Sequence, residues 1–374
     1  MNFDLSEEQQ LLKDSVERFV SDNYDLDTRQ ALSKNDAGFS DTYWQTMAEL
    51  GWLGVTVPEA QGGFGGNQAD TMVLMEAFGK GLVLEPFFAS AVLGTRAVVA
   101  GGSSELQTRL LPSMVSGECR LGLAYAEEQS RFDLEDVVTR AAPQDSGFVI
   151  TGQKSMVQHG GSADQLVVST RTSGGQRDEN GITLFLVDAQ AEGVTVDSFP
   201  TVDGQQASEI TFDGVYVGAD NMLGELDRGF TLLQDIAIDG ILALAAEAVG
   251  AMEILYKDTV DYTQERVQFD HSLADFQVLQ HRMVDMFMEY EQCKSMLYRA
   301  TLEVVQNGRD AMRTVHALKY MVGKIGTFIG ENAVQLHGGM GVTEELRIGH
   351  YFKRLLVIDA QFGNSDHHLS CFAG

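Results

Sequence analysis

The spacing of apolar residues changes twice along this chain of 374 residues, and those changes limit the folds open to it. Residues 1–118 show the three-to-four-residue periodicity of packed helices. Residues 119–226 carry short runs rich in β-branched side chains, separated by turn residues such as Asn180-Gly181. Helical periodicity returns over residues 227–374. We therefore predict an α+β fold with these three domains: N-terminal helical, middle antiparallel β, and C-terminal helical bundle.

Individual elements follow from the same patterns. Ser40 is placed to cap a helix that carries Tyr43 and Met47. The other expected helices are Thr71–Gly81, Phe87–Ala100, Ser104–Met114, Leu232–Tyr262, Phe276–Gln306 and Asp310–Val334. The expected strands are Gly147–Ile150, Gln165–Ser169, Ile182–Val187 and Glu209–Phe212, with Gly152 and Lys154 in a β-turn.

Charge and composition exclude several classes of partner. Lys and Arg number 26 against 54 Asp and Glu, which gives a formal net charge of −28. Such a chain is a poor ligand for nucleic acid or for an anionic membrane surface. No apolar run is long enough to span a bilayer, and residues 1–7 lack the basic and apolar regions of a signal peptide. The three cysteines are far apart without metal-ligand spacing, so we expect a cytoplasmic protein with reduced thiols and no metal.

Two short motifs in the last segment carry the strongest functional signal. One is the turn at residues 335–344, where three glycines within four positions permit close approach of the backbone to a bulky ligand. The other, upstream, reads Arg266-Val267-Gln268-Phe269-Asp270 and is followed by Phe276-Gln277. Together they resemble the Q-x-x-G-G-x-G and R-x-x-F-G elements of the acyl-CoA dehydrogenase family. Further similarities, at Leu50–Val55, Pro58-Glu59, Leu111-Pro112 and Gly117-Glu118, extend the resemblance over nearly the whole chain.

The resemblance implies a reaction and a cofactor. Members of this family desaturate an acyl-CoA thioester between its α- and β-carbons, with FAD accepting the hydride and a carboxylate taking the α-proton. Electron-transfer flavoprotein is then the expected electron acceptor. In this family one FAD site is built from two chains, and one of them donates the arginine, phenylalanine and Gln/Gly-rich elements.

The donated half of such a site looks intact in this sequence. By resemblance, Arg266 pairs with the FAD pyrophosphate, a geometry that suits a guanidinium. Phe269 and Gln277 accompany it, and the second element supplies Gln335, Gly338, Gly339 and Gly341. One departure is Asp270, where the family usually has glycine, because a carboxylate near phosphates is unfavourable.

The half that would lie in this chain's own β-domain departs much further from the family pattern. Where the family reads T-E-P-x-x-G-S-D, residues 126–133 read Ala-Glu-Glu-Gln-Ser-Arg-Phe-Asp. Where the family reads K-x-W-I-T, residues 154–158 read Lys-Ser-Met-Val-Gln. Methionine thus replaces the tryptophan beside the flavin, and glutamine replaces the threonine at its edge. A site that binds FAD through backbone contacts alone remains open.

The usual catalytic base is also missing. The common family position is the glutamate of a Y-E-G-T segment, and the matching residue here is Phe362. A second family position, on the helix that leads to Gly250, is matched by Gly240. The remaining candidates are Asp239, Asp359, Asp366, His367 and His368, while Glu247 is interpreted as a packing or ion-pair residue.

An intact donor half beside an altered acceptor half predicts a division of labour. The chain then resembles the small, pimeloyl-CoA dehydrogenase-like subunit of heteromeric bacterial enzymes, in an α2β2 assembly with a related chain that holds FAD and the base. Such enzymes act on bulky acyl-CoA esters of steroid side-chain or dicarboxylate type. Two alternatives are a self-sufficient homotetramer with an unusual base and a non-catalytic scaffold subunit.

Overall fold

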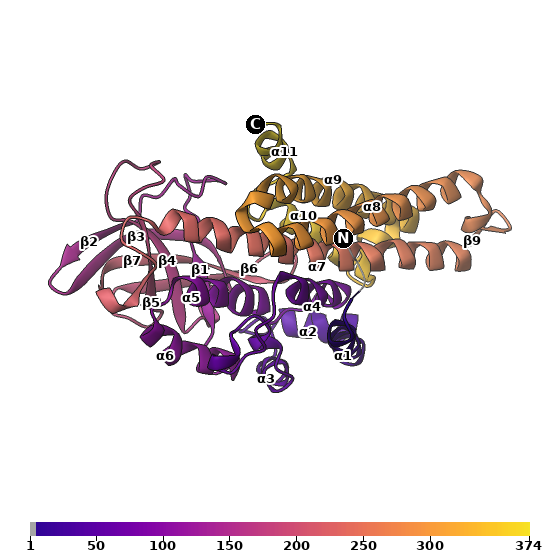
Figure 1. Ribbon diagram of the computed structural model, residues 1–374. Helices are drawn as coiled ribbons and strands as arrows, with labels where there is room; N and C mark the ends of the chain where they lie inside the picture. The colour runs from indigo at the N-terminus through magenta and orange to yellow at the C-terminus, as the bar shows by residue number, and fades with distance from the viewer. Residues whose placement is uncertain (1–4) are drawn as a thin grey trace. The chain divides into compact units, whose positions relative to one another are not determined.

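The computed structural model describes residues 5–374, so the first part of the stretch judged to lack a signal peptide lies outside it (Figure 1). Residue contacts group the chain into two compact units. Unit 1 contains the residues up to Ala31 together with Gln68–Val83 and Ile241–Gly374. Unit 2 contains Leu32–Asn67 and Leu84–Gly240. This grouping does not follow the boundaries 1–118, 119–226 and 227–374, and those three boundaries remain a prediction.

Helices occupy most of the two terminal segments, as the periodicity predicts. Ser40 caps α3, its hydroxyl accepting a hydrogen bond from the Tyr43 amide at 3.2 Å. The α-helices are α1 (Glu7–Asn23), α2 (Leu26–Ser33), α3 (Asp41–Glu49), α4 (Gln68–Gly81), α5 (Thr95–Gly101), α6 (Ser104–Val115), α7 (Gly229–Glu265), α8 (Gln277–Asn307), α9 (Met312–His337), α10 (Arg347–Ala360) and α11 (Ser365–Ala373). The π-helix η3 spans Phe88–Gly94, and short 3-10 turns include η6 (Leu273–Asp275) and η8 (Gly338–Val342).

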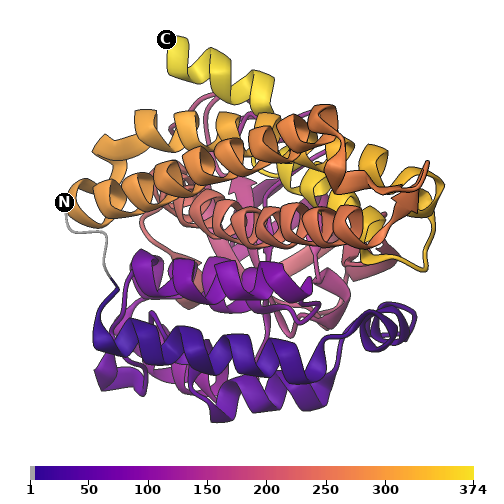
Figure 2. The same ribbon diagram turned by 90° about the vertical axis from the view of Figure 1, so that its right-hand side faces the viewer.

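Long helices packed side by side build unit 1 (Figure 2). Gly79 of α4 and Gly250 of α7 lie where these two helices touch, because a Cβ on either would collide with the backbone oxygen of Glu247 or Glu76. Glycine at both positions therefore allows the two backbones to meet. Apolar side chains of α7, α8 and α9, such as Leu255, Leu297 and Ile329, are fully buried around this contact.

An eight-stranded sheet forms the centre of unit 2. Its strands are β1 (Leu121–Ala124), β2 (Arg140–Gln144), β3 (Gly147–Gln158), β4 (Gln165–Arg171), β5 (Ile182–Asp188), β6 (Val194–Pro200), β7 (Gln206–Gly218) and β8 (Met222–Leu223). The order is β6-β7-β3-β2-β4-β5-β8, and β1 pairs with β4. Inward-facing residues such as Ile150, Phe185 and Phe212 form its core.

The structure corrects three details of the sequence prediction. The sheet is mixed, because β1 runs parallel to β4 and β2 meets β4 in a parallel pair. Gly152 and Lys154 lie inside the long strand β3 rather than in a turn, with irregular register against β7 on either side of them. The expected helix Phe87–Ala100 divides into the π-helix η3 and then α5. Among the described residues, no helix is both long and apolar enough to cross a membrane.

Candidate functional site

The residues predicted to donate to a FAD site gather at one end of unit 1. Helix α7 ends at Glu265 and α8 begins at Gln277, and the hairpin between them pairs β9 (Val267–Gln268) with β10 (His271–Ser272). Figure 1 shows this hairpin at the free end of the α7–α8 pair. Its two-residue turn consists of Phe269 and Asp270, both left-handed, with φ of 55° and 62°. The first half of the predicted site is therefore a single compact hairpin.

A ring contact ties the glycine turn to the same end of the helices. Tyr262, in the last turn of α7, stacks on His337 at the end of α9, with ring centroids 4.2 Å apart. The Tyr262 hydroxyl also approaches the carbonyl oxygen of His337 at 3.5 Å. Gly338 follows directly and ends α9 at φ of 62° and ψ of −141°, a backbone conformation that favours glycine. Through Tyr262 and His337, the structure brings the neighbourhoods of Arg266 and Gly338 together, although they are far apart in sequence.

Two features of this end fit an external anionic ligand. The exposed Arg266 side chain makes no hydrogen bond or ion pair with any residue among 5–374. An added Cβ on Gly339 would have no atom of this chain within 4 Å, so internal packing gives no reason for glycine there. Gly341 differs, because its Cβ would lie 2.8 Å from the Val334 oxygen. The guanidinium and the open glycine can hold a pyrophosphate, whereas Gly341 shapes the turn.

In the β-domain, the segment that departs from the family pattern is organised around a buried ion pair. Lys154 Nζ lies 2.7 Å from Glu127 Oε1 and donates to Ser169 Oγ at 3.0 Å. Burial lowers the pKa of Lys154 to about 8, against the opposing effect of the Glu127 carboxylate. Burial also pushes the pKa of Glu127 upward, but the Lys154 charge and hydrogen bonds outweigh it and hold that pKa below its usual range. At neutral pH both groups are charged, and the ion pair links the loop that carries Glu127 to strand β3, which carries Lys154.

Positions that face the flavin in the family carry side chains of different chemistry here. Met156 stands at the tryptophan position, exposed and left-handed with φ of 53°. Arg131 occupies a glycine position and is also left-handed, with φ of 47°. Ala126, at the threonine position, offers no hydroxyl. These residues supply neither the stacking ring nor the hydroxyl donor of the family site.

Two acidic residues of α7, the candidate base Asp239 and Glu247, are paired with arginines. Asp239 lies 3.3 Å from Arg96 of α5. Glu247 pairs with Arg354 through two hydrogen bonds of 2.6 Å, and both side chains are buried. This agrees with the interpretation of Glu247 as an ion-pair residue. A carboxylate that already balances a guanidinium is a weak proton acceptor.

The backbone of the loop that carries Phe362 is held by hydrogen bonds from Lys319 and from His368. Lys319 of α9, fully buried, donates to the backbone oxygens of Ile358, Asp359 and Gly363 at 2.7–2.9 Å. The Asp359 carboxylate, a candidate base, accepts a hydrogen bond from the Ser365 amide at 2.9 Å and so satisfies the first amide of α11, whose N-cap is Asn364.

The second contact with the Phe362 loop comes from a pair of histidines, His316 and His368. His368 Nε2 lies 2.9 Å from the Phe362 oxygen, and His368 Nδ1 lies 2.8 Å from His316 Nδ1. Because a carbonyl only accepts, His368 donates through Nε2 and receives the His316 proton at Nδ1. Burial lowers the pKa of His368 to about 3. His368 therefore stays neutral in the folded protein and acts on the loop backbone. Asp366 is exposed, and His367 contacts His368 edge-on at 5.3 Å between ring centroids.

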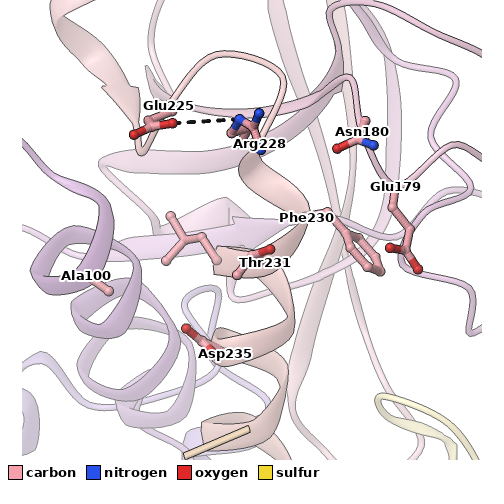
Figure 3. A pocket seen from close by; sticks show the side chains of 9 residues that line it. Ala100, Glu179, Asn180, Glu225, Arg228, Phe230, Thr231 and Asp235 are labelled. Atoms are coloured by element: carbon pink, nitrogen blue, oxygen red, sulfur yellow. Dashed lines mark ion pairs between the residues drawn. The ribbon is translucent and has the colours of Figure 1, made fainter.

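A pocket of about 370 Å³ opens in unit 2 where α7 begins (Figure 3). Its lining combines apolar and acidic side chains, and Arg228 Nε lies 3.8 Å from Glu225 Oε2. The lining residues are Ala100, Glu179, Asn180, Glu225, Arg228, Phe230, Thr231, Leu232 and Asp235. Three carboxylates line the pocket against one guanidinium, although Asp235 also lies 3.7 Å from Arg96, and this excess of negative charge disfavours a polyanion. The pocket therefore does not by itself mark a coenzyme A phosphate site.

Sequence reasoning missed the buried cations that shape these regions. Arg171, at the end of β4, donates to the backbone oxygens of Glu135, Gln176, Asp178 and Asn180 at 2.7–3.0 Å, and so fixes the loop that forms one pocket wall. Lys319 plays the same part for the Phe362 loop. Neither position has a local sequence signal, because its acceptors are backbone oxygens from distant segments. In residues 5–374 no cluster of three His, Cys, Asp or Glu side chains could hold a metal ion.

Comparison with known proteins places the chain in one family. Three models match in order: acyl-CoA dehydrogenase N-terminal domain over residues 6–118, middle domain over 122–215, and C-terminal domain over 227–373. Among solved structures, the Tcur3481–Tcur3483 steroid acyl-CoA dehydrogenase is 27% identical with a TM-score of 0.89, covering 98% of this chain and 97% of that one.

Two further structures have the same fold. The FAD complex of PigA is 27% identical with a TM-score of 0.90, covering 100% of this chain and 98% of that one. The ChsE4–ChsE5 complex from Mycobacterium tuberculosis is 24% identical with a TM-score of 0.91, at the same coverage. The predicted order of helical domain, β-domain and helical domain is confirmed. This chain belongs to the acyl-CoA dehydrogenase family of FAD-dependent oxidoreductases that act on CH–CH bonds.

Proposed function

We propose that this chain is the subunit of a heteromeric acyl-CoA dehydrogenase that donates half of a FAD site to its partner chain. Arg266, Phe269 and Gln277, with Gln335 and the glycines of η8, complete a FAD site whose other half lies in a related chain. The observation that carries this proposal is the contrast between the two halves. Within residues 5–374 the Arg266 side chain makes no hydrogen bond or ion pair, and a Cβ on Gly339 would meet open space. By contrast, the carboxylates of Asp239, Glu247 and Asp359 are already engaged by other groups of this chain.

FAD supplies the acceptor for the β-hydride, while the α-proton passes to a carboxylate of the partner chain. This chain's own contribution is positional. Arg266 neutralises and orients the pyrophosphate, and the open turn at Gly339 lets the cofactor approach the backbone. Phe362 offers no acceptor atom on its side chain for a proton. A self-sufficient enzyme using Asp239 would first have to break the Arg96 contact.

The wider assignment rests on likeness and composition. We propose a bulky acyl-CoA substrate of steroid side-chain or dicarboxylate type and an assembly of two different chains; likeness to the Tcur3481–Tcur3483 steroid enzyme, 27% identical, supports the steroid type and the paired assembly. We extend the proposal to electron-transfer flavoprotein as electron acceptor. The three free cysteines are consistent with the cytoplasm as location.

Replacement of Arg266 tests the donor role. In the complex co-expressed with a candidate partner chain of the same family, Arg266→Ala is expected to weaken FAD retention about tenfold or more, because a charge-assisted contact to phosphate is lost. Arg266→Lys keeps the positive charge but not the forked geometry of a guanidinium. Its FAD retention should therefore lie between those of the wild type and Arg266→Ala. FAD dissociation is followed by flavin fluorescence during dilution.

The matched control is Arg299→Ala, which removes another exposed guanidinium of unit 1, one paired with Glu303 at 2.8 Å. It should leave FAD retention unchanged. Equal retention in Arg266→Ala and wild type would contradict the donor role and favour the scaffold alternative.

A further inference from the structure

The turn of the β9–β10 hairpin carries two residues that the fold of this chain does not require. Two-residue hairpin turns with both φ values positive favour Asn and Gly, since other side chains meet steric resistance there. Here the positions are held by Phe269 and Asp270. Phe269 is 86% exposed, and Asp270 has no hydrogen bond or ion pair with the rest of residues 5–374. An aromatic ring and a carboxylate are thus presented outward from an unfavourable backbone.

The surroundings of this turn have the composition of an interface. Exposed apolar side chains accompany Phe269 on the hairpin, at the start of α8 and on η8: Val267, Val278, Met340 and Val342. We call these five residues together with Arg266 and Asp270 the tip surface. An exposed aromatic residue and an arginine among apolar neighbours are the residue types that dominate binding energy at protein interfaces.

Charge decides which chain can cover the tip surface. Asp270 adds a negative charge next to the place proposed for an anionic pyrophosphate, and Arg266 is the cation already committed to it. The neighbouring Glu265 and Asp275 are acidic, and His271 already lies 3.7 Å from Asp275. A second copy of this chain, with a net charge of −28, adds repulsion. A partner that covers the Asp270 carboxylate must therefore supply a positive charge to balance it.

We propose that Asp270 is the specificity-determining residue of the tip surface, pairing with a lysine or arginine of a related but different chain and disfavouring a second copy of this one. The inference rests on the proposed function and names the chemistry of the partner surface. Phe269 anchors the contact by burial, and Asp270 selects the partner by charge.

Charge variants of Asp270 test the proposal in the complex co-expressed with a candidate partner chain of the acyl-CoA dehydrogenase family. Asp270→Asn should weaken the complex about tenfold, and Asp270→Lys should weaken it further, because a like charge replaces an attraction. The salt dependence of the dissociation constant should become shallower in Asp270→Asn. For the chain alone, Asp270→Gly should increase self-association measured by sedimentation velocity.

The control is Glu265→Gln, which removes one exposed negative charge at the end of α7 but outside the turn. It should leave the dissociation constant within about twofold of wild type. A wild-type complex whose affinity and salt dependence do not change in Asp270→Asn would overturn this inference while leaving the proposed function intact. Failure of the wild-type chain to form any complex would overturn both.

Discussion

At the scale of single residues, burial separates the charges that hold this fold from those that lie on its surface. Lys154 is fully buried, and its ammonium is matched by Glu127, a serine hydroxyl and the Tyr125 backbone oxygen. The Glu127 carboxylate also accepts the amides of Val138 and Thr139. Removing one partner would leave an unbalanced charge in the core, which is far more damaging than losing a surface pair.

Lys154→Met is therefore expected to lower the free energy of unfolding by about 3–5 kcal/mol. Urea denaturation followed by circular dichroism measures it. Arg299→Met breaks the exposed pair with Glu303 and should change stability by no more than about 0.5 kcal/mol. Similar losses in the two variants would contradict the structural role assigned to the buried pair. Adding Glu127→Gln to Lys154→Met should recover part of the loss, since no uncompensated carboxylate remains.

The glycines of η8 divide into two kinds, and alanine distinguishes them. Gly341→Ala should lower stability by roughly 1–3 kcal/mol, because its Cβ would lie 2.8 Å from the Val334 oxygen and 3.0 Å from the Val334 Cα. Gly339→Ala should leave stability nearly unchanged, because the added methyl meets only open space. The same Gly339→Ala change should weaken FAD retention in the heteromeric complex. Thermal unfolding and flavin release measured on both variants check this; unchanged flavin release in Gly339→Ala would remove that glycine from the proposed site.

At the scale of elements, the connection between α9, α10 and α11 depends on groups that respond to acid. His316 on α9 and His368 on α11 meet through their Nδ1 atoms, and Lys319 and His367 add positive charge nearby. Burial lowers the pKa of both His316 and His368. A second proton on this pair would break the contact that holds the Phe362 loop.

Stability should therefore fall as the pH drops below 6.5. The pKa of His368 is about 3 in the fold against 6.5 in the unfolded chain, so the unfolded state takes up the proton first. The contribution of His368 is fully present above pH 6.5 and is lost towards pH 3. Between pH 7 and pH 4 the loss amounts to about 3 kcal/mol. Urea unfolding of wild type and His368→Gln at both values measures it: the variant should be less stable at pH 7 but less sensitive to pH. Parallel pH profiles would contradict the buried neutral histidine.

Some helices and strands could be predicted from the sequence and others could not. Long periodic segments such as α7 and α8 were predictable because each repeats its apolar spacing over many turns. The π-helix η3 was not, because it depends on contacts with distant residues; the Leu121 amide, for example, binds the Ser90 hydroxyl at 3.1 Å. The parallel pairing of β1 with β4 and the place of Lys154 inside β3 likewise depend on which strands meet. Local patterns carry no record of such pairing.

At the scale of the whole molecule, the chain combines two regions that match its family's sequence motifs to different extents. The motifs of the C-terminal segment keep the family pattern, whereas residues 126–133 and 154–158 of the β-domain depart from it. The motifs that contain Arg266, Phe269 and the η8 glycines could be recognised from sequence because each motif is contiguous, while their role in a FAD site stays a prediction. The engagement of Asp239 by Arg96 and of Asp359 by the Ser365 amide could not, because each depends on tertiary packing. The family and the fold follow from the sequence, whereas the division of labour between chains is a proposal about an assembly.

Flavin stoichiometry tests that proposal most directly. The chain is purified alone and also co-expressed with a candidate partner chain of the same family, and FAD is measured by absorbance against protein concentration. We expect no FAD on the chain alone and one FAD per two chains in the complex, since only the partner's β-domain holds the flavin. One FAD per chain in the protein purified alone would contradict it and would show a self-sufficient enzyme with an unorthodox base.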